Sequence, residues 1–162
     1  MKGSLCLINP YDQEHLKLIT EYELTNGINN KISEFIKDIK KLSKEEYEKQ
    51  KYANDYELIL VIIDQGKIKD SCHIQVEKDI KSCYITLVPT KSRDYHRNII
   101  TRATDYAMNI LGMQEVFIKL PTADKNLLLN LENQGFENLG TENGEYIFLK
   151  DQETILESKY HL

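Results

Sequence analysis

The pattern of apolar and polar positions in the first third of the chain predicts one strand followed by three helices. The short apolar run 5–8 is typical of a strand, and apolar positions recur at helical spacing over 12–26 and over 28–42. Ser43 followed three residues later by Glu46 is a capping-box pattern, so a further helix is expected to begin there. Its side chains are mostly charged, which favours a helix exposed to solvent.

The middle of the chain predicts three antiparallel strands joined by turns. Residues 57–63 form a β-branched, apolar run typical of a buried strand, and the segment 64–67 has the Asp and Gly residues of a turn. Apolar side chains then alternate with polar ones over 70–76 and over 83–88, with a second turn expected within 77–80. This alternation is typical of a meander with one face in a core.

The last third predicts helices and strands in alternation. In chain order we expect a helix over 97–111, a strand over 116–120, a helix through 127–131 and two short strands at 136–139 and 145–149. A strand–helix–strand unit beside an antiparallel meander favours one mixed, mostly antiparallel central sheet flanked by helices, in the α/β (α+β) class.

Length and charge limit the classes of protein that fit this pattern. The 162 residues suit a single domain, expected over 1–150, with 151–162 as a C-terminal tail or an extra element. The net charge of −5 disfavours a nucleic-acid partner, although an α+β domain binding nucleic acid through a basic loop remains a minor hypothesis. The apolar run 58–63 is too short to span a membrane, so no membrane partner is expected.

The three cysteines, Cys6, Cys72 and Cys83, are an odd number without paired spacing, which favours a reducing, cytoplasmic location. If Glu77 and Lys78 form the second turn, Cys72 and Cys83 pair directly across the hairpin and lie in the core. The spacing of Cys and His residues matches no metal site, so we expect no metal.

Several segments from Val88 to Gly140 resemble a known family. They are Val88-Pro89, Ile99-Ile100, Asp105-Tyr106-Ala107, Leu111-Gly112, Val116 and the stretch from Asn130 to Phe136 with its Gly135-Phe136 pair. Together with the order of elements, they resemble the GNAT family of acyl-CoA-dependent N-acyltransferases. The resemblance implies the GNAT fold, acetyl-CoA as cosubstrate and transfer of an acetyl group to a primary amine of a small molecule or protein.

The GNAT signature is a loop of the form Q/R-x-x-G-x-G/A between the fourth strand and the next helix. Its glycines allow backbone N–H groups to approach a pyrophosphate at the start of the helix. This chain has no glycine there: one alignment places Lys91, Asp94 and His96 at the signature positions, and the other places Arg93, His96 and Asn98.

The resemblance implies where the coenzyme binds. Backbone groups at the end of a fourth strand that separates from the fifth would contact the pantetheine arm and polarise the thioester carbonyl. Basic side chains in the following loop, with Arg102 about one turn further on, would hold the phosphates in place of glycines. The expected coenzyme contacts are Leu87, Val88, Arg93, Asp94, Tyr95, His96, Arg97, Asn98, Asp124 and Asn126.

Acyl transfer to an amine needs a group that accepts the proton of the amine. The candidates near the expected centre are Tyr84, Thr86 and His73, whereas Glu77 is expected in a turn away from it. The position of the proton-donating Tyr of many GNAT enzymes is Leu131 here.

Two functional hypotheses follow. Because no activated nucleophile is visible, the first is an N-acetyltransferase that works by direct attack of the amine, without a covalent enzyme intermediate. The second is a catalytically inactive GNAT-like module that binds a ligand or a protein, which the missing glycines and the missing Tyr favour. Either protein could form a homodimer through its C-terminal strand.

Overall fold

The structure is a computed structural model that describes residues 3–27, 31–51, 53, 55–87, 96–120 and 125–152. Within these residues it contains one seven-stranded sheet and five helices in the predicted order. The strands are β1 (Ser4–Leu7), β2 (Tyr56–Asp64), β3 (Lys67–Glu77), β4 (Ser82–Leu87), β5 (Glu115–Leu120), β6 (Glu137–Glu142) and β7 (Glu145–Asp151). The helices are α1 (Gln13–Asn26), α2 (Lys31–Ile39), α3 (Lys44–Gln50), α4 (His96–Asn109) and α5 (Lys125–Asn133).

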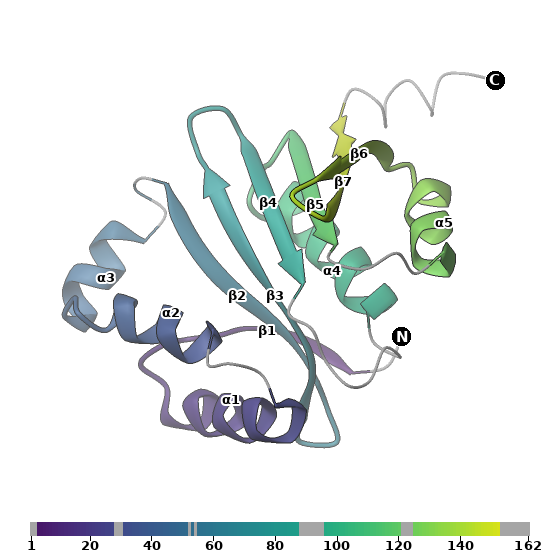
Figure 1. Ribbon diagram of the computed structural model, residues 1–162. Helices are drawn as coiled ribbons and strands as arrows, with labels where there is room; N and C mark the ends of the chain where they lie inside the picture. Colours follow the sequence, from purple (N-terminus) through teal and green to yellow (C-terminus); the bar gives the residue numbers. More distant parts are fainter. Residues whose placement is uncertain are drawn as a thin grey trace.

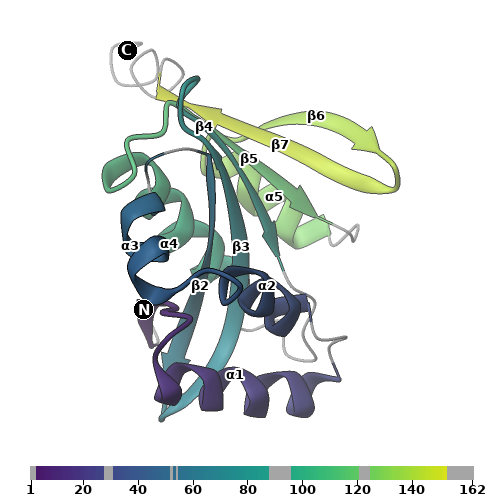
Figure 2. The ribbon, with the colours of Figure 1, turned by 90° about the vertical axis from the view of Figure 1, so that its left-hand side faces the viewer.

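The sheet is mixed, as predicted, with the strand order β1-β2-β3-β4-β5-β7-β6. Only β4 and β5 pair in parallel among the described strands, because α4 connects them as a crossover. Figure 2 shows the β6–β7 hairpin at the opposite edge of the sheet from β1. This architecture confirms the predicted fold class.

Helices cover both faces of the sheet (Figure 1). One face packs its apolar side chains against α1 and α2, in a core that includes Ile59 and Val61 from β2 with Ile19 and Ile36 from the helices. The other face packs against α4 and α5, in a larger core that includes fully buried Phe148. We call these the α1–α2 face and the α4–α5 face.

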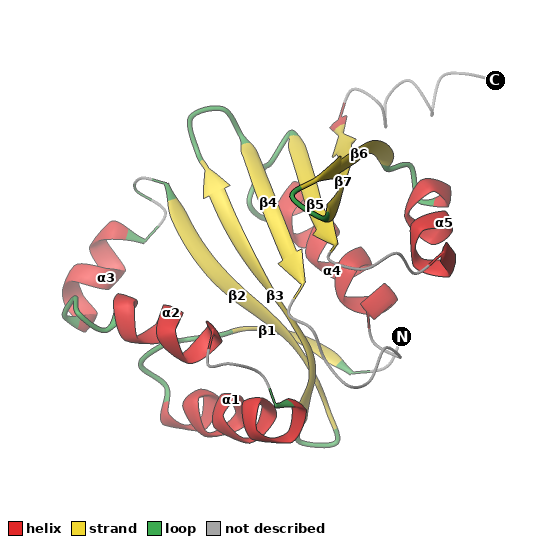
Figure 3. Cartoon of the chain, in the orientation of Figure 1, coloured by secondary structure: helices red, strands yellow, loops and turns green. Residues whose placement is uncertain are grey.

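Local sequence signals explain where the helices begin (Figure 3). Asp12 caps α1 by accepting hydrogen bonds from the backbone N–H groups of Glu14 and His15. The predicted capping box of α3 is confirmed, with Ser43 accepting from the Glu46 N–H and Glu46 accepting from the Ser43 N–H. α3 is largely exposed, as expected, whereas α2 is shorter than the predicted helix over 28–42.

The predicted pairing of Cys72 with Cys83 is wrong. The turn between β3 and β4 has four residues, Lys78–Lys81, rather than the two assumed, so Cys72 pairs with Leu87. Both thiols are nevertheless fully buried in the α4–α5 face, which confirms their place in the core.

At the C-terminal end, β7 continues to Asp151, one residue past the expected limit of the domain. Residues 153–162 lie outside the described part of the chain, so their role as a tail or an extra element stays a prediction. None of the described helices has the length and apolar composition needed to cross a membrane.

Candidate functional site

A pocket of about 710 Å³ lies on the α1–α2 face, between the sheet and the helices α2 and α3. Its floor comes from the β-strands and its walls come largely from the two helices. The lining residues are Phe35, Ile39, Leu42, Tyr47, Gln50, Lys51, Asp55, Tyr56, Glu57, Gln75, Val76, Glu77, Tyr84 and Lys119. Aromatic and charged side chains are therefore close together in one concave site.

A row of paired side chains crosses four strands, and three of its members, Glu57, Gln75 and Tyr84, line the floor of the pocket. Glu57 on β2 pairs with Gln75 on β3, Gln75 pairs with Tyr84 on β4, and Tyr84 pairs with Phe117 on β5. Directly paired residues point to the same face of a sheet, so strand register brings this row together. The rings of Tyr84 and Phe117 stack with centroids 4.9 Å apart and an interplanar angle of 16°.

Polar contacts link the members of this row to their neighbours. Gln75 donates from Nε2 to Oε1 of Glu57 at 3.0 Å. The Nζ atom of Lys119 lies 4.9 Å from the ring centroid of Tyr84, within the range of a cation–π interaction. Tyr84 thus lies between an anionic group held by Gln75 and a cationic group on the next strand.

His73 lies in the adjacent row of the same face, paired with Thr86 on β4 and Ile59 on β2. Its ring meets Phe35 of α2 edge-on, with centroids 5.2 Å apart, and its Nε2 atom lies 3.7 Å from Oε1 of Glu57. Burial lowers the pKa of His73 below its usual value, and the nearby Glu57 carboxylate partly opposes this shift. His73 is therefore held mainly as a neutral imidazole near neutral pH.

The α3 wall of the pocket is held by tyrosines. The Tyr11 hydroxyl donates to the carbonyl oxygen of Leu42 at 2.7 Å, and its ring lies 5.6 Å from the ring of Tyr47. Partial burial raises the pKa of both Tyr47 and Tyr56, so both remain protonated phenols at neutral pH. They can contact a ligand through an apolar ring and a hydroxyl group.

The structure brings the three proton-acceptor candidates to one face of the sheet. Tyr84 lines the pocket, whereas His73 and Thr86 lie in the next row and do not line it. Sequence reasoning did not single out Glu57 or Lys119. The alternation of side chains along β5 could have identified Lys119. Its side chain points to the same, more exposed side of β5 as those of Phe117 and Glu115.

The expected coenzyme contacts that the structure describes lie at the carboxyl ends of β4 and β5. Because β4 and β5 are parallel, Leu87 at the end of β4 lies on the same side as the starts of α4 and α5. His96 opens α4, the Arg97 side chain is exposed, and Asn126 is exposed in the first turn of α5. Asn98, also in the first turn of α4, is half-buried. Val88, Arg93, Asp94, Tyr95 and Asp124 lie outside the described residues.

Two features at the carboxyl ends of β4 and β5 bear on coenzyme binding. The recorded pairing of β4 with β5 ends at Thr86 and Lys119, so Leu87 lies beyond the parallel ladder. Backbone N–H groups in the first turn of a helix can bind a phosphate, and the exposed Arg97 adds a cation there. The described residues are therefore compatible with a diphosphate at the start of α4.

Two further side chains discussed from the sequence, Arg102 and Leu131, lie among the described residues. Arg102 donates from Nη1 to the carbonyl oxygen of Gly3 at 2.9 Å, so it ties the segment before β1 to α4. Leu131 is fully buried in the core beneath α5. Its position therefore provides no proton donor to the pocket.

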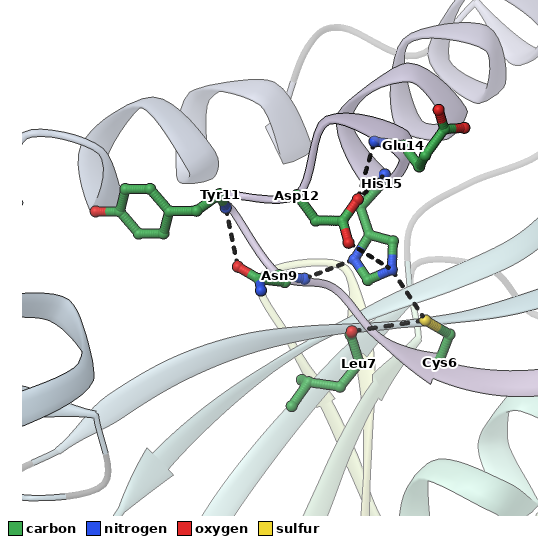
Figure 4. A network of polar contacts seen from close by, with 7 residues as sticks. All are labelled: Cys6, Leu7, Asn9, Tyr11, Asp12, Glu14 and His15. Carbon is green, nitrogen blue, oxygen red and sulfur yellow. Dashed lines mark hydrogen bonds and ion pairs between the residues drawn. The ribbon is translucent and has the colours of Figure 1, made fainter. Parts of the chain in front are cut away.

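A second polar cluster lies beside β1 and combines a thiol, an imidazole and a carboxylate (Figure 4). The backbone N–H of Asn9 donates to Nδ1 of His15 at 2.9 Å, so the neutral ring bears its proton on Nε2. That nitrogen lies 3.8 Å from Sγ of Cys6 and 4.0 Å from Oδ2 of Asp12. A protonated nitrogen cannot accept the thiol proton, and burial together with Asp12 raises the pKa of Cys6.

This cluster therefore anchors the start of α1 and is not arranged as a nucleophilic cysteine with its base. Among the described residues, no group of three or more His, Cys, Asp or Glu side chains is placed to bind a metal ion.

No protein-family model and no curated protein sequence matches the chain. Solved structures do. A mutant form of the spermidine/spermine N-acetyltransferase SpeG from Vibrio cholerae matches with a TM-score of 0.65 at 16% identity, over 98% of each chain. The dodecameric spermidine N-acetyltransferase from Vibrio cholerae matches with a TM-score of 0.64 at 18% identity, over 97% of this chain and 98% of that one.

A chimera of the Vibrio cholerae enzyme and hSSAT gives a TM-score of 0.64 at 17% identity, over 96% of this chain and 99% of the chimera. These N-acetyltransferases are GNAT proteins. The chain thus has the GNAT fold along almost its whole length, which confirms the fold that the resemblance implied.

Proposed function

We propose that this protein is an N-acyltransferase that transfers an acetyl group from acetyl-CoA to an amine bound in the pocket on the α1–α2 face. The observation that carries the proposal is the likeness of the whole chain to N-acetyltransferases, at a TM-score of 0.65 over 98% of its length. The pocket adds support, because its floor includes Tyr84 of β4 and Lys119 of β5, the parallel strands that α4 connects.

Acetyl-CoA supplies the acyl group as a thioester, and a neutral amine attacks its carbonyl carbon. The C–N bond forms as the C–S bond breaks, and coenzyme A leaves as a thiolate that takes a proton from solvent. The chain contributes binding and proton transfer. Glu57, whose side chain is 45% exposed, attracts the ammonium form of the acceptor into the pocket. The pair formed by Glu57 and neutral His73 then accepts the proton that the amine must lose.

Tyr84 and Thr86 are the other proton-acceptor candidates on this face, and Tyr84 is the one that lines the pocket. Coenzyme contacts are assigned to the backbone at Leu87 and Val88 and to side chains at the start of α4, including Arg97. The neighbours are named for spermidine, so a polyamine is one acceptor to include in the test.

An inactive ligand-binding module is the second candidate. It is favoured by the absence of glycine from residues 88–98 and by the burial of Leu131 where many GNAT enzymes have a Tyr. Such a module would bind a ligand or a protein without releasing thiol.

Calorimetric titration with acetyl-CoA, followed by a thiol-release assay with a panel of primary amines, tests these candidates. Saturable binding together with amine-dependent thiol release supports the enzyme. Binding without thiol release for any amine supports the module instead. Absence of any heat or thermal stabilisation up to millimolar acetyl-CoA overturns the enzyme and supports a module that binds a different ligand or a protein.

A homodimer and a cytoplasmic location remain part of the proposal. One structural neighbour is described as dodecameric, which makes self-association worth measuring. Light scattering at two protein concentrations distinguishes a monomer from a stable oligomer.

A further inference from the structure

Lys119 is a cation in the floor of the pocket that has no carboxylate partner among the described residues. It projects from β5 on the α1–α2 face, and its Nζ atom lies over the ring of Tyr84. Within the described part of the chain it makes no ion pair. An ammonium group that lines a pocket and contacts only an aromatic face is available to bind an anionic group of a ligand.

Glu57 provides the opposite charge on the other side of Tyr84. Gln75 orients the carboxylate by donating to Oε1 at 3.0 Å. Glu57 lies on β2 and the Lys119 ammonium reaches over Tyr84 on β4, two strands away. Neighbouring strands are about 4.8 Å apart, so the two charges are on the order of 10 Å apart.

The other charged side chains that line the pocket either contact another group of the protein or lie at the end of a strand. Asp55 accepts from the backbone N–H of Lys78 at 3.0 Å, and Lys51 lies 3.9 Å from Glu48. Glu77 is exposed at the end of β3. Glu57 and Lys119 are therefore the pair best placed to bind the two ends of one small ligand.

We propose that the acceptor is an amino-carboxylate, such as an amino acid or a short peptide, whose amine lies at Glu57 and whose carboxylate is bound by Lys119. This inference rests on the proposed function, since it names the substrate class of the same pocket. A contact of about 3 Å at each end leaves about 4 Å between the charges of the ligand, which is the scale of a small amino acid. A polyamine would place a second ammonium beside Lys119, where like charges repel.

Matched pairs of acceptors that differ only in the carboxylate test this directly. Lysine and cadaverine, ornithine and putrescine, and glycylglycine and glycylglycinamide are compared in the thiol-release assay at saturating acetyl-CoA. The wild-type protein is expected to use the carboxylate-bearing member at least about tenfold more efficiently in one or more pairs. Equal or better use of the uncharged or decarboxylated member in all three pairs overturns the proposal.

Substitutions at Lys119 assign the preference to this residue. K119Q is expected to remove the preference, and K119E to reverse it in favour of the amine without a carboxylate. The matched control is K150Q, because Lys150 also lies over an aromatic ring, Phe136 at 5.5 Å, but does not line the pocket. A carboxylate preference that persists unchanged in K119E overturns the proposal, and circular dichroism verifies that each variant is folded.

Failure of the proposed function is distinguishable from failure of this inference. If no amine releases thiol, the enzyme hypothesis fails, and the same ligand pairs are titrated calorimetrically against the protein without acetyl-CoA. Tighter binding of the carboxylate-bearing member, lost in K119Q, still supports the assignment of the pocket. Equal affinity for the two members of each pair, or no binding of any ligand, overturns this assignment of the pocket.

Discussion

The Nε2 atom of His73 lies 3.7 Å from Oε1 of Glu57, and the ring of His73 packs against Phe35 in a T-shaped arrangement. This pair connects the buried part of the α1–α2 face with the pocket, because Glu57 lines the pocket and His73 does not. Burial is the main cause of the lowered pKa of His73, and Glu57 acts against it. The charge of His73 is thus coupled to the stability of the fold as well as to the proposed chemistry.

The first prediction concerns stability against pH. With its pKa lowered in the folded state, His73 binds a proton more readily in the unfolded chain, so acidification below about 6.5 favours unfolding. The resulting loss of stability begins as the pH falls through the usual His value and ends below the lowered value of the folded state. H73F keeps an aromatic ring beside Phe35 and removes the titrating group.

Urea denaturation at pH 7.5 and pH 5 measures this effect. The free energy of unfolding of the wild type should fall more between these pH values than that of H73F, since all other titrating groups are shared. Equal losses in the two proteins would show that His73 does not have a lowered pKa in the native state.

A second prediction concerns the thiols. Burial raises the pKa of Cys72 and Cys83, that of Cys83 to about 12, and both side chains are inaccessible to solvent. Cys6 is only partly buried, although its pKa is raised as well. In the native protein at pH 8, a maleimide should therefore label Cys6 slowly and the other two cysteines only on global unfolding.

Mass spectrometry of the labelled protein counts and locates the modified thiols. C6S should show no native labelling, and in urea it should still incorporate two labels. Native labelling of Cys83 at a rate similar to that of Cys6 would contradict its place in the core.

The third prediction tests the capping box at the start of α3. S43A removes the side-chain acceptor of the Glu46 N–H and should cost about 1 kcal/mol of stability, whereas S43D retains an acceptor and should cost much less. The midpoint of thermal unfolding should fall by about 3 °C in S43A. T20A serves as a control on an exposed helical surface, and a shift as large as that of S43A would argue against a specific capping effect.

A fourth prediction concerns the coenzyme. If Arg97 binds a phosphate at the start of α4, R97A should raise the Kd for acetyl-CoA by up to about tenfold and reduce its dependence on salt. K150Q removes a cation from β7 that lies over the ring of Phe136, and it should leave the Kd for acetyl-CoA unchanged. Isothermal titration at two salt concentrations gives both quantities. An unchanged Kd in R97A would exclude Arg97 from the phosphate site.

Much of the fold could be predicted from the sequence because its signals are local. The period of two in 70–76 and 83–88 places His73, Tyr84 and Thr86 on one face and the two cysteines on the other. The turn between these strands was too short in the prediction. The partner of Cys72 is consequently Leu87 and not Cys83. The register differs from the prediction by an even number of residues, so every side chain remains on its predicted face of the sheet.

The candidate site depends more strongly on contacts between distant segments. Glu57, Gln75 and Tyr84 belong to three different strands, and Lys119 reaches Tyr84 from a fourth after the crossover through α4. No local pattern specifies that these four side chains meet, because register across a sheet is decided by turn lengths and by packing against the helices.

By itself, the sequence determined the order of the elements, the capping of α1 and α3, and the apolar face of each strand, because each of these depends on residues a few positions apart. Only the tertiary structure decided that Arg102 donates a hydrogen bond to Gly3, that Leu131 is buried, and that Glu57 and Lys119 flank Tyr84. These relationships arise when segments far apart in the chain pack against one another. The number of residues between two positions in the sequence does not determine how close their side chains lie in space.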